Sequence, residues 1–464
     1  MGRRPLAVTA PSPLHRGYRL LSRLLTLPLL AWLWWRGRKE PGYRRHMGQR
    51  LGFLNVQPAS NGCILIQAAS VGEIQAARPL IQALRQEWPD HSLMVSTHTP
   101  TGVATLQSHW GDAIAHTYSP LDTPGACARF LDRLQPRVLV LLEREIWPEM
   151  LLQCRAMAIP VILVNARLSE HSLSLYQRWD GLMAPIWPQL ALVAAADSAS
   201  MERLARLGIA PERLVETGNL KFDTPTPAHE GTVAEALRDR QLIVAGSTHE
   251  AEETSLLAAW PEWQARHPGT LLVLVPRHPQ RFQAVADRLR QLGIAHVRHS
   301  LGEQPQAHTS VLLGDTMGEL SRWYGHAAVC FIGGTLAPIG GHNPLEALAM
   351  GKPVLFGPHI RNAQTLFEAI EDAGAGQRVA SATELLATAQ TWLAEPDAMA
   401  RKATQAQAFM QLHQGATLRC LQAMRPLLGH PTSPVVVAHL EGQTIWSDPA
   451  RLPAVTPTLF DPPA

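Results

Sequence analysis

Short apolar runs alternate with longer amphipathic segments along most of the chain. The apolar runs of the first half lie at 64–66, 93–95, 138–142 and 161–164. They are typical of strands buried on both faces, and segments with helical spacing, such as 74–87 and 124–134, separate them. Residues 218–222 close this series, and apolar runs begin again at 242–245, 271–275, 311–313, 329–332 and 354–356. Each series predicts a parallel sheet covered by helices on both faces.

The restart of the pattern predicts two doubly wound, Rossmann-like domains of the α/β class. We expect the first at 51–222, a Pro- and Thr-containing linker at 223–232, and the second at 233–430, ending in a long helix over about 398–428. Residues 431–464 resemble a loose, Pro-rich tail. Because such sheets bind ligands at the carboxyl ends of their strands, we expect the two domains to face a ligand-binding cleft.

The first 50 residues carry the apolar run 24–35 between clusters of arginine. The run is shorter than the roughly 20 residues that a helix needs to cross a bilayer. Trp34-Trp35-Arg36 at its end is unlike the small-residue cleavage site of a signal peptide. Residues 1–50 are therefore predicted to form a membrane-associating segment on an anionic membrane face, with the rest of the chain cytoplasmic. The alternative is a buried core helix with a charged flank.

Composition narrows the class of protein. The chain has 464 residues, of which 46% are hydrophobic and 17% charged, as in folded globular proteins. A formal charge of +3 does not indicate a nucleic-acid partner. The five cysteines have no Cys-x-x-Cys spacing, so they predict buried free thiols and neither a zinc site nor a disulfide framework.

The heptad 340–346, Gly-Gly-His-Asn-Pro-Leu-Glu, combines several features of a nucleotide site. Its glycines allow a ligand to approach the backbone closely. Asn343 is a preferred N-cap, Pro344 fits the first helical position, and Glu346 has the position that closes a capping box. The free N–H groups of such a helix attract phosphate, and the carboxylate could hold ribose hydroxyls. The alternative is a well-capped helix without a ligand.

Acidic residues follow two strands of the first half. Ser70 and Glu73 have the spacing of a capping box, but Glu73 would also lie at the carboxyl end of a strand, where the positive helix end would keep it ionised and ready to accept a proton. Glu143 and Glu145 come directly after a very apolar strand and are expected to point to the same side. Lys221 could stabilise charge on a departing phosphate, or could form a surface ion pair.

Two further motifs follow strands of the second half. Arg277, within 276–282, suits recognition of phosphate or carboxylate, and 314–320 opens another helix. Each motif is weakly specific alone. Four of them at strand-to-helix turns of two successive sheets form a more specific pattern.

Together these motifs resemble those of the bacterial 3-deoxy-D-manno-octulosonic acid (Kdo) transferases. The resemblance extends from about Tyr18 to Leu428 and is carried by residues 40–43, 50–52, 70–73, 99–102, 165–169, 218–223, 246–249, 275–279, 315–320 and 341–346. It implies a GT-B glycosyltransferase that moves Kdo from CMP-Kdo to a lipid A precursor, lipid IVA, in lipopolysaccharide synthesis. The reaction would take place at the cytoplasmic face of the inner membrane, by direct inverting transfer without a metal or other cofactor.

The resemblance also implies roles for single residues. Glu73 would be the general base that deprotonates the acceptor hydroxyl, and Glu143 and Lys221 would stabilise the transition state. The CMP seat would comprise Pro276, Arg277, Met317, Gly318, Glu319, Asn343, Pro344, Leu345 and Glu346.

Two positions depart from the family pattern, and two other functions stay open. Gln67 replaces the usual histidine before the Ser70 motif, and Arg144 replaces the usual threonine between the two glutamates. The same architecture is found in other nucleotide-sugar glycosyltransferases and in sugar-nucleotide epimerases. A non-catalytic, membrane-bound nucleotide-binding module is the other alternative.

Overall fold

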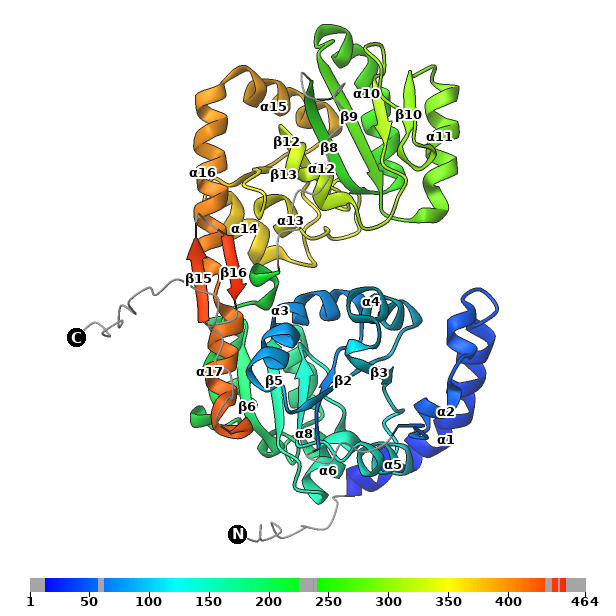
Figure 1. Ribbon diagram of the computed structural model, residues 1–464, viewed down its shortest axis with the longest axis vertical. Helices are drawn as coiled ribbons and strands as arrows, with labels where there is room; N and C mark the ends of the chain where they lie inside the picture. The colour runs from blue at the N-terminus through cyan, green and yellow to red at the C-terminus, as the bar shows by residue number, and fades with distance from the viewer. Residues whose placement is uncertain are drawn as a thin grey trace, which may run out of the picture. The chain divides into compact units, whose positions relative to one another are not determined.

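The computed structural model describes residues 13–56, 62–224, 237 and 240–429, together with the backbone of 436–440 and 443–447. The chain divides into two compact units (Figure 1). The first comprises residues 1–224 and 414–464, and the second comprises residues 225–413.

The first unit contains a seven-stranded parallel sheet. Its strands are β1 (Cys63–Gln67), β2 (Ser92–Thr97), β3 (Ala115–Tyr118), β4 (Val138–Leu142), β5 (Val161–Ala166), β6 (Leu190–Ala195) and β7 (Leu214–Glu216). Their order in the sheet is β3-β2-β1-β4-β5-β6-β7. Ile64 pairs with Leu93 on one side and with Val138 on the other. The order reverses between β1 and β4, which is where open α/β sheets bind ligands.

Helices cover both faces of this sheet. They are α3 (Val71–Glu87), α4 (Pro100–Trp110), α5 (Pro124–Leu134), α6 (Pro148–Ala156), α7 (Glu170–Arg178), α8 (Asp180–Met183), α9 (Ser198–Ala205) and α17 (Ala416–Leu428). Alternate residues of β1 enter different cores: Ile64 and Ile66 belong to one hydrophobic cluster and Leu65 to another. The continuous apolar strands of the sequence are thus explained by burial on both faces.

The second unit repeats this plan. Its strands are β8 (Gln241–Thr248), β9 (Thr270–Pro276), β10 (His296–Arg298), β11 (Val311–Leu313), β12 (Val329–Ile332), β13 (Val354–Phe356) and β14 (Gly376–Arg378). They form a parallel sheet in the order β10-β11-β9-β8-β12-β13-β14, which reverses between β8 and β12. Its helices are α10 (Glu250–Arg266), α11 (Phe282–Gln291), α12 (Leu320–His326), α13 (Leu345–Leu348), α14 (Gln364–Asp372), α15 (Ala382–Ala394) and α16 (Pro396–His413). The prediction of two parallel, doubly wound sheets is confirmed.

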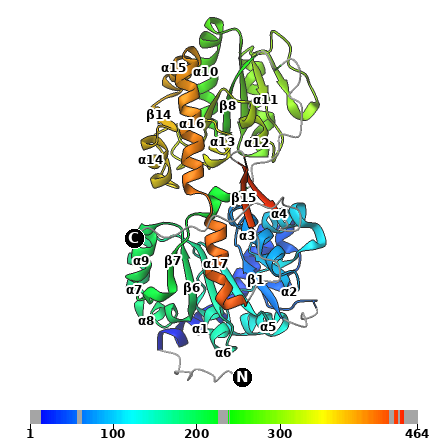
Figure 2. The same cartoon turned by 60° about the vertical axis from the view of Figure 1, so that its left-hand side comes forward.

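The long helix expected over 398–428 is two helices, α16 and α17, separated at Gln414 and Gly415. Gly415 has a φ of 89°, a left-handed conformation that glycine adopts at little cost. Helix α17 packs on the core of the first unit beside α3 (Figure 2), and Arg425 pairs with the buried Glu87 at 2.6 Å. The chain therefore returns to the first unit at residue 414, whereas we expected the second domain to continue to 430.

Asp223 fixes the point of return. Its carboxylate accepts hydrogen bonds from the backbone N–H groups of Gly415, at 2.7 Å, and Thr417, at 2.6 Å. The residues just before the second unit and just after it are thus held by one side chain.

The N-terminal segment forms α1 (Pro13–Arg36), which continues through Pro28, and α2 (Met47–Arg50). Two contacts fix α1 to its unit: the Tyr18 hydroxyl donates to Asp122 at 2.6 Å, and Arg19 pairs with Glu149 at 2.7 Å. Within the part of the chain that the structure describes, no helix is long and apolar enough to cross a membrane.

All five cysteines are buried free thiols, as predicted. In the region expected to be a loose tail, β15 (Val436–Leu440) and β16 (Gln443–Ser447) pair as an antiparallel hairpin. The other residues of the tail, residues 1–12 and residues 225–232 of the expected linker lie outside the described residues.

Candidate active site

Glu73 lies in the first turn of α3, just after β1, at the point where the strand order of the sheet reverses. Ser70 is the N-cap, and its side chain accepts a hydrogen bond from the backbone N–H of Glu73. The Glu73 carboxylate in turn accepts one from the N–H of Ala69. These two hydrogen bonds cap the start of α3 and hold the carboxylate at the carboxyl end of the sheet.

The electrostatic surroundings of Glu73 differ from those that we expected. Burial, followed by the negative charge of Glu145, raises its pKa to about 7, although the hydrogen bond from Ala69 opposes the shift. Glu143 adds a smaller contribution in the same direction. The expectation that the helix end keeps Glu73 fully ionised is wrong, because desolvation and two neighbouring carboxylates outweigh the helix end. A pKa near neutrality suits a group that takes up a proton during a reaction.

Glu143 and Lys221 meet across the same edge of the sheet. The Lys221 ammonium lies 2.9 Å from Glu143 Oε1, and their side chains are only 30% and 18% exposed. Glu143 adopts a φ of 53°, a left-handed conformation that is costly for a residue other than glycine. Asn165 accepts a hydrogen bond from the N–H of Leu220 and so holds the turn that carries Lys221. The two residues thus form a half-buried pair on a constrained backbone.

Glu145 is a site residue that the sequence did not single out beyond its nearness to Glu143. It accepts a hydrogen bond from Trp147 at 2.8 Å and lies 3.3 Å from His98 Nε2. Burial alone would raise its pKa, but the hydrogen bonds from His98 and Trp147 lower it. Glu145 therefore stays ionised while its charge raises the pKa of Glu73. Two carboxylates with pKa values moved in opposite directions are typical of acid–base chemistry.

An apolar groove of about 450 Å³ begins at the same two residues, His98 and Trp147. Helix α1 forms one wall and the loops after β2 and β3 form the other. The lining residues include Leu21, Leu25, Leu29, Trp32, Leu33, Arg36, Tyr43, Arg50, Pro120 and Leu121. Because His98 and Trp147 contact Glu145, the groove leads to the carboxylates around Glu73 within one unit.

In the second unit, the residues that follow β8, β9 and β12 form a cluster of three histidines beside Arg277. His249 Nε2 lies 2.8 Å from His342 Nε2, and the His278 ring is 5.4 Å from the His249 ring. Arg277, predicted to bind phosphate, is exposed directly after Pro276, which is buried. None of the histidines was singled out from the sequence, because residues 93 positions apart give no local signal of contact.

The heptad 340–346 forms a different cap from the one predicted. Helix α13 is a single turn, and Asn343 Oδ1 accepts from the N–H of Leu345 at 3.2 Å. Glu346 does not close a capping box; its carboxylate accepts a hydrogen bond from Ser321 of α12 at 3.2 Å, and burial raises its pKa. Asn343 is exposed, whereas the Pro344 and Leu345 side chains are buried in the unit. Of the four residues 343–346 that were predicted to form the seat, only Asn343 and Glu346 offer polar side-chain groups to a ligand.

The loop before α12 presents Met317, which is 60% exposed, and Gly318, whose φ is +84°. Glu319 next to them lies 3.0 Å from His299 and 3.4 Å from Arg322, so its carboxylate already has partners. Ser321 joins this loop to Glu346.

Among the residues that the structure describes, no group of three or more His, Cys, Asp or Glu side chains could hold a metal ion.

Comparison with known proteins identifies the family. Residues 45–224 match the model of the 3-deoxy-D-manno-octulosonic-acid transferases (kdotransferases). The 3-deoxy-D-manno-octulosonic acid transferase of Haemophilus influenzae is 37% identical over 398 residues, which cover 84% of this chain and 93% of the relative. The chain belongs to the 3-deoxy-D-manno-octulosonic acid transferase family. It is therefore a glycosyltransferase, and the resemblance seen in its motifs is confirmed.

Two solved structures are similar to parts of this Kdo transferase. The C-terminal CMP-Kdo binding domain of WaaA from Acinetobacter baumannii is 36% identical, covers 38% of this chain and 91% of its own, and has a TM-score of 0.37. A putative UDP-N-acetylglucosamine 2-epimerase from Listeria monocytogenes is 18% identical, with a TM-score of 0.56 over 79% of this chain and 98% of its own. The second likeness shows a GT-B-like fold and nothing about the reaction.

Proposed function

We propose that this Kdo transferase moves Kdo from CMP-Kdo onto a lipid A precursor, lipid IVA, in lipopolysaccharide synthesis. One observation carries the proposal: the apolar groove beside α1 leads, through His98 and Trp147, to a carboxylate whose pKa is about 7. An acceptor that carries acyl chains and sugar hydroxyls needs an apolar surface for the chains. It also needs a base, at the end of that surface, to take the proton of the reacting hydroxyl. The groove and Glu73 supply these two features.

Glu73 acts as the general base in this proposal. The acceptor hydroxyl oxygen attacks the anomeric carbon of Kdo, and its proton passes to the Glu73 carboxylate. The bond between the anomeric carbon and the phosphate oxygen breaks, and CMP leaves with the bonding electrons. Attack from the face opposite CMP inverts the anomeric configuration.

Lys221 and Glu143 stabilise charge at the same edge of the sheet. The ammonium of Lys221 supplies a positive charge for the transition state, and its 2.9 Å contact with Glu143 fixes its position. Arg277 in the second unit supplies a permanent charge for the phosphate, so side chains of the chain, and not a metal ion, neutralise the phosphate charge in this mechanism.

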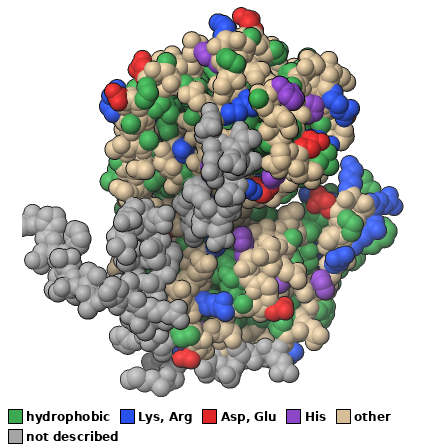
Figure 3. Space-filling view, turned by 45° about the horizontal axis from the view of Figure 1, so that its top comes forward, with side chains coloured by type: hydrophobic (Ala, Val, Ile, Leu, Met, Phe, Trp, Pro, Cys, Tyr) green, Lys and Arg blue, Asp and Glu red, His purple; other side chains and the backbone are tan. Residues whose placement is uncertain are grey.

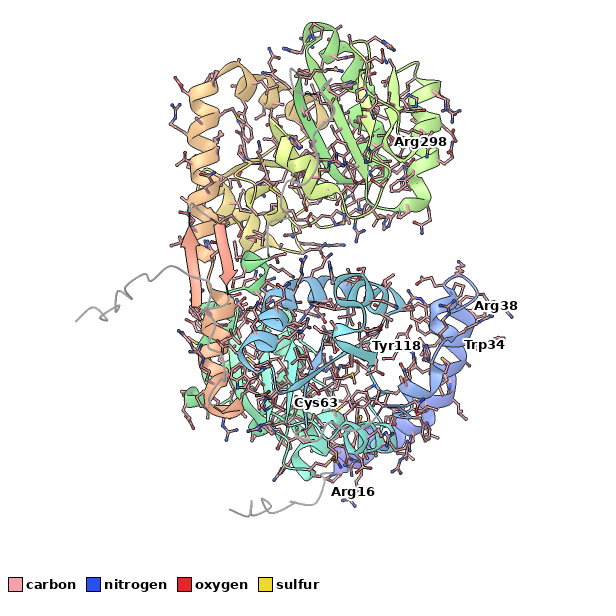
Figure 4. The ribbon with its side chains drawn as sticks, viewed as in Figure 1. Arg16, Trp34, Arg38, Cys63, Tyr118 and Arg298 are labelled. Carbon is pink, nitrogen blue, oxygen red and sulfur yellow. The ribbon has the colours of Figure 1, made fainter. Side chains whose placement is uncertain are left out.

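Helix α1 places the enzyme on the cytoplasmic face of the inner membrane in this proposal. Many of its large apolar side chains are exposed: Leu20, Leu21, Leu24, Leu25, Leu27, Trp32, Trp34 and Trp35 are between 47% and 76% accessible. Figure 3 shows Lys and Arg side chains beside hydrophobic ones on this edge of the first unit. Figure 4 labels Arg16 near the start of α1, Trp34 in its last turn and Arg38 just after its end. Arg44 stacks over Trp34 at 4.3 Å. Exposed Trp and Leu with basic flanks are typical of helices that lie in an anionic interface.

The decisive experiment combines the purified protein, CMP-Kdo and lipid IVA, and follows CMP release and the mass of the lipid product. We expect CMP to be released only when the lipid is present, and the lipid mass to increase by Kdo. Release of UDP from a UDP-sugar, with no CMP release, would favour another nucleotide-sugar enzyme of this fold. Binding of CMP without any transfer would favour a non-catalytic module.

A further inference from the structure

A buried glutamate occupies the glycine loop at the switch point of the second sheet. The Glu252 carboxylate accepts backbone hydrogen bonds from Gly334, Thr335, Leu336 and Ala337 at 2.8–3.2 Å, and a fifth from His249 at 3.0 Å. Its residue is only 2% exposed. Loops of this kind often bind an anion of the ligand through their N–H groups. Here the anion is part of the protein, so these N–H groups are not available to the donor.

The loop is also tightly packed against its neighbours. A Cβ atom on Gly333 would lie 2.3 Å from the carbonyl oxygen of Ser247, and one on Gly334 would lie 2.9 Å from the His342 ring. The loop therefore has little room to rearrange around a ligand. Side chains at its rim have to recognise the negative charges of the donor.

His249 and His342 are the side chains at this rim. Their ring planes are within 5° of parallel, with centroids 5.1 Å apart and Nε2 atoms 2.8 Å apart, so the rings meet edge to edge and share one proton. The other charged or titratable groups around His249 are Glu252, Glu253, Arg277 and His278.

The surroundings favour a neutral pair in the free protein. Burial, followed by the charges of His249, Arg277 and His278, lowers the pKa of His342 to about 4. Burial also lowers the pKa of His249, although Glu252 opposes this shift. The positive charge of Arg277 helps to keep the rings neutral. An anion bound beside them would raise their pKa values and favour their protonation.

We propose that His249 and His342 together bind the carboxylate on the anomeric carbon of the donor sugar. This proposal rests on the proposed function, because Kdo carries such a carboxylate next to its phosphate ester. Once the hydrogen bond between them is broken, two Nε2 atoms 2.8 Å apart are close enough for each to donate to one oxygen of the same carboxylate. Each ring turns its Nε2–H from the other ring to one oxygen, and the ring that accepts in the free protein gains an N–H by moving its proton from Nδ1 or by taking one up. Arg277 is left to bind the phosphate.

The test compares two ligands that differ by the sugar. Binding of CMP-Kdo and of CMP is measured by calorimetry on the full chain, separately from the transfer assay. We expect His249→Ala and His342→Ala each to weaken CMP-Kdo binding roughly tenfold to a hundredfold, as for the loss of a hydrogen bond to a charged group. CMP binding should change less than twofold. His342→Gln, which keeps an amide donor, should recover part of the loss. The matched control is His308→Ala, at an exposed histidine three residues before the start of β11.

Three outcomes would overturn the proposal. A lower melting temperature with unchanged CMP-Kdo binding would make the pair a structural contact between α10 and the loop. Equal weakening of CMP and CMP-Kdo would assign the pair to the phosphate. Equal affinity of the wild-type chain for CMP and CMP-Kdo would show that no carboxylate site exists. Tight CMP-Kdo binding without transfer would contradict the proposed function alone and leave the carboxylate site supported.

Discussion

Glu73 and Glu252 occupy the same position in the two units. Each is the third residue of the helix that follows the first strand of its unit, and each turns back toward the preceding loop. Glu252 accepts five backbone hydrogen bonds and is buried at the centre of the glycine loop. Glu73 accepts a backbone hydrogen bond from Ala69 and lies beside two other carboxylates.

The difference shows how one local motif serves two purposes. A carboxylate surrounded by N–H donors is satisfied as an anion and stabilises the loop around it. A carboxylate with few donors and negative neighbours has unused acceptor capacity and a raised pKa, so it can take up a proton. The number of donors, and not the position in the helix, distinguishes the proposed base from the structural residue.

The largest expected effect is that of Glu73→Gln on the transfer reaction. Glutamine keeps the size of the side chain but cannot take up the proton, so kcat should fall roughly 10²- to 10⁴-fold. The CMP dissociation constant should change less than twofold. Glu170→Gln, at a residue whose side chain is 61% exposed, is the control. A near-normal kcat for Glu73→Gln would show that Glu73 is not the base, so that it would not differ in function from the structural Glu252.

Glu252→Ala should act on the fold of the second unit. It would leave five buried or half-buried N–H groups without their acceptor, at a cost of about 3–5 kcal/mol in the free energy of unfolding. Hydrogen exchange should show lost protection at residues 334–337, with the strands of the first unit unaffected. Unchanged exchange at these residues would show that the Glu252 carboxylate does not stabilise the loop.

Lys221→Ala should have an intermediate effect. Removing the cation should lower kcat roughly 10- to 100-fold and leave Glu143 without its partner. Lys221→Arg, which keeps the charge, should lose less. Equal losses in both variants would show that the shape of the lysine, and not its charge, matters.

The pH dependence of the enzyme should follow Glu73. Since its pKa in the folded protein is about 7 and only the ionised form is a base, kcat/KM should fall about tenfold per pH unit below 7 and level off above it.

The raised pKa of Glu73 should also make the stability of the folded protein depend on pH. A carboxyl with a raised pKa in the folded state binds its proton more tightly than in the unfolded chain, so stability should decrease as the pH rises from 4.5 to 7. Thermal unfolding of Glu73→Gln should show a smaller decrease; an identical pH dependence in both proteins would contradict the assignment.

The smallest effect is expected from α1. Replacing Trp34 with Ala removes one exposed apolar side chain, and it should lower binding to anionic vesicles only about threefold to tenfold. The KM for a vesicle-bound lipid acceptor should rise by a similar factor, while the CMP dissociation constant stays constant. A change in CMP binding instead would show that the effect is not confined to the acceptor side.

The sequence predicted most of the fold because buried parallel strands are continuous apolar runs. The family resemblance also assigned Glu143 and Lys221 to one site. Their contact does not follow from adjacent strands, because Glu143 follows β4 and Lys221 follows β7, with β5 and β6 between them. The sequence could not predict the pairing of His249 with His342 or of Glu346 with Ser321, which depends on which strands are adjacent in the sheet. The break between α16 and α17 had a local signal in Gly415, but only the packing of α17 on α3 shows to which unit the last helix belongs.

Asp223 marks the place where the chain leaves the first unit and later returns to it. One carboxylate holds residues 192 and 194 positions further along the chain, so the second unit begins and ends at a single place on the first. In genetic terms, residues 225–413 are an insert within the first unit. A short loop in place of this insert should allow the first unit to be produced alone, and an insert from another relative should allow the second unit to be exchanged without altering the first.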